Sequence, residues 1–552
     1  MIKVQIRTNE GKLIEATYEK SVAIKEIVAD FEASSRNTVA YKINNQFVHG
    51  NTIIDKDSEI EEICLNSQEG LKVYVDTLIF LVSMAVYKLY RNEEALYIEH
   101  SIGDGIYCEL AHEKVTESTV QKIAQEMKNL IDRKIPIEKV SVPINNAYEI
   151  LHSLKRGDVI KNLDFHNKRN VDLYKADDYF DYYPRPLSPH TGCVTQYDFI
   201  LVNGGFVLRF PAMADGTIKK TFTLPEKLFA QNQEHDKWLK ILNVDTVGDI
   251  NRFINAKHIR DFIVTEEALH EKKIAYLADS ISKRKTAKFV LIAGPSSSGK
   301  TTFAKRLAVQ LTVNGYVPFV MGMDDYFLPR TQTPLLPNGD YDFESIGALD
   351  VELLNRDLTA LLSGEEIRLP RYNFITGDRE MSNHTLKLGT DNILIMEGIH
   401  GLNELLTASI PAENKVKIYI SALNQLNIDN HNRIPTTDCR RIRRIVRDSQ
   451  YRGYSAEETL TRWPAVREGE NKNIFPFQES ADFMFNSTLT YELGVFRKYV
   501  MPLLCSIGHK SAVYNEAQDL IALLEHFLDI RDELVPNNSL LREFIGGSVF
   551  EY

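Results

Sequence analysis

The chain has 552 residues, several times a typical domain, so we expect it to fold as roughly three or four domains. Its 43% hydrophobic and 26% charged residues are typical of a soluble globular protein with a sizeable core. Lys and Arg number 65 against 76 Asp and Glu, a net charge of −11. This charge argues against a protein held to nucleic acid mainly by non-specific attraction to phosphates.

The five cysteines are odd in number, lie far apart and include no CxxC pair. This argues against a disulfide framework or a cysteine-rich zinc site and favours a reducing compartment. The first residues have no apolar signal-peptide segment, and the most apolar run, residues 78–86, is far shorter than the roughly 20 residues that span a bilayer. We therefore expect a cytoplasmic protein with no membrane partner.

Residues 1–66 have the pattern of a small α+β unit. Alternating apolar residues predict a hairpin over residues 2–18 with its turn at 9–11, and Ser21 is a candidate N-cap for a helix over 22–32. Further strands are predicted at residues 41–48 and 60–66. This order of elements suggests a ubiquitin-like unit.

The rest of the chain divides by its pattern. Residues 67–225 mix helical segments with strand-like pieces such as 199–210, and residues 226–285 are helical and suggest a connector. From 286 to 552 buried strands alternate with helices, which is typical of a parallel α/β sheet.

The most informative segment follows an apolar strand pattern at residues 289–293. The sequence GPSSSGKT fits G-x-x-x-x-G-K-[ST] and a helical pattern follows at once, which argues against an incidental glycine-serine turn. Its glycines let backbone N–H groups surround phosphate oxygens, and the helix adds its positive N-terminal end. Lys300 is expected to reach the β- and γ-phosphates, and the Thr301 hydroxyl to ligate Mg²⁺. The predicted nucleotide-binding residues are Gly294, Pro295, Ser296, Ser297, Ser298, Gly299, Lys300, Thr301 and Thr302.

Two carboxylates close later apolar strands. Asp324 follows YVPFVMGM, and Glu397 ends NILIME. Because ligands collect at the carboxyl ends of strands in a doubly wound sheet, both are candidates for Mg²⁺ binding or general-base work. Taken singly, each is equally well explained as a strand-end cap or a solvated turn residue.

Aromatic and basic clusters complete the set. The aromatic residues are Tyr341, Phe343, Tyr372 and Phe374, which suit either a sandwich around a planar base or core packing. The basic residues are Arg440, Arg441, Arg443, Arg444, Arg447 and Arg452. Most such runs are solvated helix faces, but arginines on a mobile helix of a phosphotransferase can close over a triphosphate.

With these motifs in order, residues 288–500 resemble the uridine kinase and phosphoribulokinase family, closest to uridine–cytidine kinases. The matching motifs are GPSSSGKTT, DDYF, GDYDFESIGALD, RYNF, MEGI and RRIVRDSQYRG. The resemblance implies an α/β P-loop domain with a parallel sheet. It also implies transfer of a phosphoryl group from ATP or GTP, with Mg²⁺, to the 5′-hydroxyl of a pyrimidine nucleoside such as uridine or cytidine.

The resemblance also implies roles by position. Asp324 would activate the acceptor hydroxyl and help Thr301 and Glu397 to hold Mg²⁺, while Glu344 falls where an aspartate binds the ribose hydroxyls. The implied catalytic residues are Asp324, Lys300, Arg444, Arg447 and Arg452. The implied acceptor-binding residues are Glu344, Tyr372, Phe374 and Arg379.

Three departures leave the acceptor open. Gly377 stands where uridine–cytidine kinases carry a base-reading histidine, Tyr454 replaces a lid arginine, and Glu344 is one methylene longer than the family aspartate. The phosphoryl-transfer residues are therefore better retained than the base-reading ones. The alternative is a non-nucleoside acceptor such as a phosphorylated sugar or pantothenate.

The N-terminal third resembles a different family. Residues 1–66 are similar to a β-grasp TGS domain, and residues 67–225 to the editing region of threonyl-tRNA synthetase, through HSIGDGIYCEL and SPHTGCVTQYDFIL. That editing site uses an HxxxH and a CxxxH pair, and the matching positions here are Asp76, Phe80, Tyr183 and Leu187. The resemblance implies two α+β domains without the metal ligands.

A regulatory protein associated with RNA or the ribosome through these domains is a further alternative, against which the net acidity argues. The sequence leaves open whether the protein forms oligomers.

Overall fold

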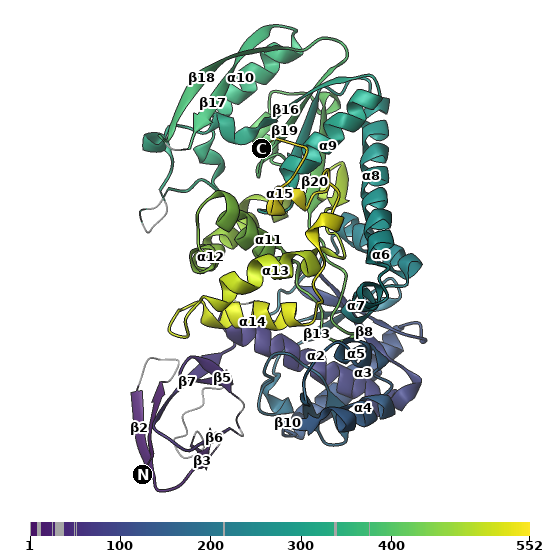
Figure 1. Ribbon diagram of the computed structural model, residues 1–552, viewed down its shortest axis with the longest axis vertical. Coiled ribbons are helices and arrows are strands. Elements are labelled where there is room, and N and C mark those ends of the chain that lie inside the picture. Colours follow the sequence, from purple (N-terminus) through teal and green to yellow (C-terminus); the bar gives the residue numbers. More distant parts are fainter. Residues whose placement is uncertain are drawn as a thin grey trace.

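The computed structural model describes residues 2–7, 13–24, 26–27, 38–48, 50, 52–212, 216–335, 339, 341–374 and 376–551. The fold is multidomain, as predicted, with N-terminal α+β units followed by an α/β domain. In Figure 1 the α/β domain lies at the top and the N-terminal units at the bottom, and the long helix α8 (Ile259–Lys283) runs along one side.

The first unit is a mixed sheet in the order β2-β1-β7-β4-β5, in which β1 pairs antiparallel with β2 and parallel with β7. The predicted hairpin is confirmed, although its turn at residues 9–11 lies outside the described residues. Val22 and Ala23, predicted to be helical, instead form a strand that pairs with β6. The strands are β1 (Ile2–Arg7), β2 (Leu13–Tyr18), β3 (Val22–Ala23), β4 (Thr38–Ile43), β5 (Gln46–Val48), β6 (Ile53–Ile54) and β7 (Ser58–Cys64).

The second unit is built around α2 (Gln68–Tyr90), whose N-terminus is capped by the Ser67 hydroxyl. By length and composition the described helix Gln68–Glu93 could cross a membrane, but 78% of its apolar window is buried, as expected of a core helix. Two sheets, β13-β14-β9-β8 and β10-β11-β12, pack around it. The other elements are β8 (Leu96–Ile102), β9 (Gly105–Leu110), α3 (Glu117–Asp132), β10 (Glu138–Pro143), α4 (Ile144–Ser153), α5 (Gly157–Leu163), β11 (Asn170–Ala176), β12 (Tyr179–Asp181), β13 (Asp198–Val202) and β14 (Gly205–Arg209).

Helices α6 (Glu226–Leu242), α7 (Val247–Asn255) and α8 lead into a parallel sheet of order β16-β19-β15-β20-β21. Its central strand, β15, is buried along its whole length, which explains its continuous apolar run. The carboxyl ends of β15, β16 and β19 lie at one edge of the sheet. The elements of this domain are β15 (Phe289–Ala293), α9 (Lys300–Val313), β16 (Val317–Gly322), α10 (Val351–Leu362), β17 (Glu366–Asn373), β18 (Asp378–Lys387), β19 (Asn392–Glu397), β20 (Lys415–Ser421), α11 (Thr436–Tyr451), α12 (Ala456–Asn473), β21 (Phe483–Asn486), α13 (Glu492–Cys505), α14 (Tyr514–Glu525) and α15 (Arg542–Ile545).

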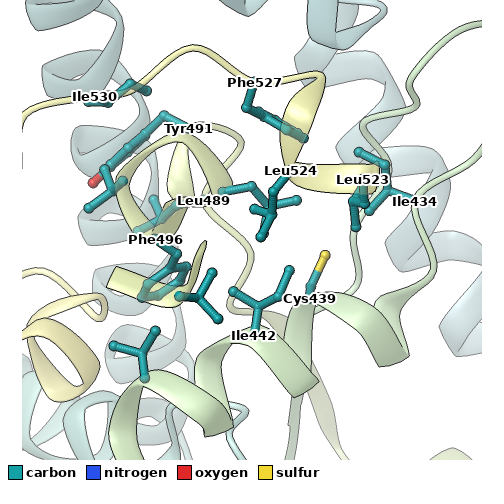
Figure 2. Packing of buried hydrophobic residues seen from close by; sticks show 14 of the residues in the cluster. Ile434, Cys439, Ile442, Leu489, Tyr491, Phe496, Leu523, Leu524, Phe527 and Ile530 are labelled. Atoms are coloured by element: carbon teal, nitrogen blue, oxygen red, sulfur yellow. The ribbon is translucent and has the colours of Figure 1, made fainter. Parts of the chain in front are cut away.

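The largest core cluster fixes α11. Figure 2 shows Cys439 and Ile442 of α11 facing Phe496 of α13 and Leu524 of α14. All four side chains are buried to 2% exposure or less. Burying a large apolar side chain contributes roughly 1.5–3 kcal/mol, so this face holds α11 firmly while its arginines project elsewhere.

Candidate functional site

The loop between β15 and α9 has the geometry that its sequence predicts. A Cβ on Gly294 would lie 2.0 Å from the carbonyl oxygen of Ile420, so glycine alone fits at this crossing. The Lys300 ammonium donates to the carbonyl oxygens of Gly294, at 3.0 Å, and Pro295, at 3.4 Å. The lysine therefore lies over the loop, beside the first turn of α9.

The two predicted carboxylates lie beside this loop. The Thr301 hydroxyl donates to Glu397 Oε1 at 2.9 Å. Burial raises the pKa of Asp324 to about 7, and the neighbouring Glu397 carboxylate adds to this rise. Burial also raises the pKa of Glu397 itself. Asp324 keeps access to solvent, as a group that meets a ligand must.

The donors present fit a hard cation. The Thr301 hydroxyl and the carboxylates of Asp324 and Glu397 are all oxygen ligands, which Mg²⁺ prefers. Among the described residues no group of three His, Cys, Asp or Glu side chains is arranged to hold a metal. Mg²⁺ bound here would therefore need phosphate oxygens and water to complete its coordination.

Helices α11 and α12 hold Ser296 of the loop. Arg444 Nη1 donates to Ser296 Oγ at 2.8 Å, and Arg440 Nε donates to the Ser296 carbonyl oxygen at 3.0 Å. Glu470 of α12 pairs with Arg440 and accepts a hydrogen bond from the Ser296 N–H at 3.0 Å. Glu470 was not predicted, because nothing in its local sequence marks a loop contact.

The other predicted lid arginines make no described hydrogen bond to the loop. Arg447 Nη2 lies 2.8 Å from Asp448 Oδ1, and Arg452 Nε lies 3.7 Å from the same oxygen. Arg444 Nε also pairs with Asp448, at 3.2 Å. Asp448, which was not predicted from the sequence, thus forms ion pairs with Arg444, Arg447 and Arg452. Its spacing four residues after Arg444 on one helix was the available signal.

The predicted acceptor-binding residues differ in whether their side chains are accessible to a ligand. The rings of Tyr372 and Phe374 lie 5.0 Å apart, but Tyr372 is 4% exposed and Phe374 is 59% exposed. Tyr372 therefore packs in the core, and Phe374 keeps a free face. Arg379 Nη2 pairs with Asp350 Oδ2 at 2.8 Å, so this guanidinium is committed to a carboxylate that caps α10.

Glu344 lies among the charges of the phosphate site. Burial and the Glu470 carboxylate raise the pKa of Glu344, whereas Arg444 and Lys300 lower it. Its side chain packs directly on Gly469 of α12, where a Cβ would lie 2.7 Å from Glu344 Cβ.

The structure explains the departure at Gly377. This residue has a φ of +77°, and a Cβ there would lie 2.7 Å from Arg330 Nε. Arg330 Nη2 also donates to the Phe374 carbonyl oxygen at 2.9 Å. A histidine at position 377 would therefore require Arg330 to move. Arg330, like Glu470 and Asp448, was not predicted from the sequence.

Tyr454, the other departure, lies under a guanidinium from α12. The Arg462 guanidinium carbon is 4.1 Å from the centre of the Tyr454 ring. A positive charge is thus present beside Tyr454 although the family arginine is missing.

The C-terminal tail contacts the start of α9. Glu543 Oε2 accepts hydrogen bonds from the Thr302 N–H, at 3.1 Å, and from the Thr302 hydroxyl, at 2.7 Å. Leu540 packs against the loop, since a Cβ on Gly299 would lie 3.2 Å from its methyl group. Thr302, predicted to bind nucleotide, is therefore engaged by a carboxylate of the same chain.

The positions matched to the synthetase editing site lie together in the second unit. Arg185 donates to both carboxylate oxygens of Asp76, at 2.7 and 2.8 Å. The rings of Phe80 and Tyr183 make an edge contact at 5.9 Å, and Leu187 is 2% exposed. An ion pair and apolar packing therefore fill the place of the four metal ligands.

Comparison with known proteins agrees with this division. Residues 289–493 match the model of the Phosphoribulokinase / Uridine kinase family. A uridine kinase of Lactobacillus helveticus is 29% identical over 194 residues, which cover 35% of this chain and 83% of that protein. The C-terminal half thus contains a P-loop kinase domain of this family, which implies nucleotide binding.

The threonine–tRNA ligases match a different part. Threonine–tRNA ligase 2 of Bacillus subtilis is 27% identical over 206 residues, covering 37% of this chain and 32% of that enzyme. The ligase of Clostridium tetani is 27% identical over 267 residues, covering 48% and 40%. The chain therefore spans a third to two-fifths of the length of these ligases, and its N-terminal region resembles their N-terminal TGS and editing domains.

Proposed function

We propose that the protein is a nucleoside kinase that transfers the γ-phosphoryl group of ATP or GTP to the 5′-hydroxyl of a pyrimidine nucleoside such as uridine or cytidine. One observation carries the proposal: Lys300, Thr301, Asp324 and Glu397 lie together at one edge of the parallel sheet. The raised pKa of Asp324 and the contact of Arg444 with the loop support it.

The residues of the site suit an in-line transfer. Lys300 and the loop N–H groups would bind the phosphates, and Arg444 would stabilise the charge on the transferred group. Asp324, with a pKa of about 7, would accept the proton of the acceptor hydroxyl as its oxygen bonds to the γ-phosphorus. The bond from that phosphorus to the nucleoside diphosphate then breaks. Mg²⁺ held by Thr301, Glu397 and Asp324 would neutralise phosphate charge.

A second acceptor class is favoured by Arg330. Among the described residues this arginine forms no ion pair, and it lies beside Phe374, in the place that a side chain at position 377 would occupy. A guanidinium so placed suits an acceptor that carries a phosphate or carboxylate group. A phosphorylated sugar or pantothenate would meet this requirement.

An assay of the purified chain with ATP or GTP, Mg²⁺ and a panel of acceptors tests both candidates. We expect uridine or cytidine to be phosphorylated, and Arg330→Ala to leave this activity within about twofold. If an anionic alcohol is preferred instead, the same substitution should lower activity towards it by about tenfold or more. Bound ATP with no phosphorylation of any nucleoside would contradict the first candidate.

We also place this activity in the cytoplasm. The five cysteines all lie in the described residues and none is joined to another by a disulfide, which suits a reducing compartment. Detection of the chain only in an oxidising compartment of its host would contradict this proposal.

A further inference from the structure

A cavity lies between the synthetase-like unit and the kinase domain. It has a volume of about 300 Å³, at the lower end of the range for small-molecule sites. Leu71 and Val75 of α2 and Phe210 form part of its wall from the N-terminal side. Helices α11 and α14 supply the opposite wall, through Arg441 and Leu523 among others. The cavity thus exists only where the two parts of the chain meet.

Among the described residues, three ion pairs of Lys or Arg join side chains that both line this cavity. Lys72 of α2 reaches across to Asp519 of α14 at 2.6 Å. Arg185 pairs with Asp76 at 2.7 Å, and Arg441 pairs with Asp438 at 3.3 Å. These three cations are therefore each matched by one carboxylate.

A fourth cation in the cavity wall has no carboxylate partner. Arg433 donates to Ser101 Oγ at 2.7 Å, but no ion pair joins it to any carboxylate in the described part of the chain. The Nε of Arg441, a residue only 4% exposed, also lacks a hydrogen-bond partner among the residues that the structure describes. Burial and the charge of Arg185 lower the pKa of Arg433 to about 10, and the nearby carboxylates of Asp438 and Asp76 offset only part of this shift. A positive charge that is neither fully solvated nor paired is costly, and an anion would offset that cost.

We propose that this cavity binds a small molecule with one carboxylate or phosphate group on an apolar body. A guanidinium group such as that of Arg433 or Arg441 can donate two parallel N–H bonds to a pair of oxygens of a carboxylate or a phosphate. Leu71, Val75 and Phe210 offer apolar contacts to the remainder of the molecule. The proposed ligand is thus distinct from the nucleotide and the acceptor.

Helix α11 links this cavity to the phosphate site. Arg441 lines the cavity, whereas Arg440 and Arg444 contact Ser296 of the loop. The intervening face of α11 is locked in the core through Cys439 and Ile442, as Figure 2 shows. Because this packing makes α11 move as one body, a ligand that displaces the helix through Arg441 would also displace the loop contacts of Arg440 and Arg444 and would act as an effector of nucleotide binding. This coupling rests on the proposed function, whereas binding in the cavity does not.

Calorimetric titration of the full chain tests the site with three probes that share an aromatic body. They are 3-phenylpropionate, benzyl phosphate and the neutral 3-phenylpropanol. We expect saturable binding of at least one anion at one site per chain, and none of the alcohol. The anion that binds more tightly identifies the preferred group. The Lys300→Ala variant should bind the anion as the wild type does, because the P-loop is not the site.

Two variants locate the binding. Arg433→Gln should weaken binding of the anion by about tenfold or more. Arg356→Gln, the control, changes a side chain of the kinase domain that is 72% exposed and should leave the binding unchanged. Ala522→Leu, which fills the cavity from α14, should also weaken binding while leaving all four cations in place. Circular dichroism of each variant verifies that the chain is folded.

Failure to bind either anion at about 10 mM would overturn the proposal, as would unchanged binding by Arg433→Gln or loss of binding by Lys300→Ala. For the coupling, a saturating anion should change the affinity for a non-hydrolysable ATP analogue by about twofold or more. An unchanged affinity would overturn the effector role. Absence of any nucleotide binding would instead count against the proposed kinase.

Discussion

The two regions of the chain that resemble catalytic sites differ in how their polar groups are satisfied. In the synthetase-like unit Asp76 is matched by Arg185, and Phe80 packs on Tyr183. At the kinase sheet edge Asp324 and Glu397 remain close together, with raised pKa values. Buried charges without a ligand tend to be paired or replaced, because an unmatched charge is costly. Carboxylates that stay close together with raised pKa values are therefore the better candidates for a functional site.

The largest effect is expected from a substitution at the sheet edge of the kinase domain. Asp324→Asn should lower kcat by about 10²–10⁴-fold, because it removes the proposed proton acceptor. Nucleotide affinity should change far less, which equilibrium binding measures. Asp391→Asn, a change at the exposed residue just before β19, serves as the control. A kcat for Asp324→Asn within a few-fold of wild type would show that this carboxylate is not the base.

Phe80→Ala tests the N-terminal side. Phe80 is fully buried against Tyr179 and Tyr183, so the change should destabilise this unit by about 3–5 kcal/mol through the cavity it leaves. Hydrogen exchange of α2 measures the loss. Kinase turnover per folded molecule should stay unchanged at low temperature. A specific loss of turnover in folded Phe80→Ala would contradict the division of roles.

Nucleotide binding should release a proton near neutral pH. Since the pKa of Asp324 is raised to about 7, this carboxylate is largely protonated at pH 6 and ionised well above pH 8. A cation that arrives with the nucleotide favours the ionised form. Titration in two buffers of different ionisation enthalpy should show proton release that is larger at pH 6 than at pH 8.5, and Asp324→Asn should reduce the release at pH 6. Proton uptake at pH 6 would have the wrong sign.

Glu543→Gln tests whether the C-terminal tail competes with phosphate for the P-loop. The Glu543 carboxylate takes the Thr302 N–H and hydroxyl, which the motif otherwise offers to a phosphate. Removing its charge should raise nucleotide affinity by about three- to tenfold. Glu533→Gln, on an exposed side chain nearby in the sequence, should have no effect. Weaker binding by Glu543→Gln would mean that the tail supports the loop instead of competing with phosphate.

The smallest effect concerns one hydroxyl. The Tyr183 hydroxyl is buried and has no hydrogen-bond partner in the described part of the chain. Tyr183→Phe should therefore change the free energy of unfolding by less than about 1 kcal/mol, or stabilise the unit. The Tyr74 hydroxyl, in contrast, donates to the Gln196 carbonyl oxygen at 2.6 Å. Tyr74→Phe should therefore cost about 1–3 kcal/mol. Equal losses in thermal unfolding would mean that Tyr183 has a partner.

How much the sequence predicts depends on how local each feature is. The strand, loop and helix of the phosphate site are contiguous, so one motif predicts them together. Glu470 and Glu543 were missed because their partners lie on distant segments that the fold brings together. The crowding of Gly377 by Arg330 likewise depends on a loop contact across 47 residues. Asp448 was missed although its arginine partners lie within four residues of it in the sequence. The local sequence pattern thus predicts the residues that bind phosphate, whereas most of the side chains that hold those residues in place can be identified only from the tertiary structure.

The most direct test is phosphoryl transfer by the full chain from γ-labelled ATP to a nucleoside panel, comparing wild type, Lys300→Ala and Phe80→Leu. We expect wild type and Phe80→Leu to label uridine or cytidine at similar rates per folded molecule. Lys300→Ala should lose about 10³-fold or more, because it removes the positive charge over the loop. Undiminished transfer by Lys300→Ala, or no labelled nucleoside from wild type with ATP bound, would contradict the account.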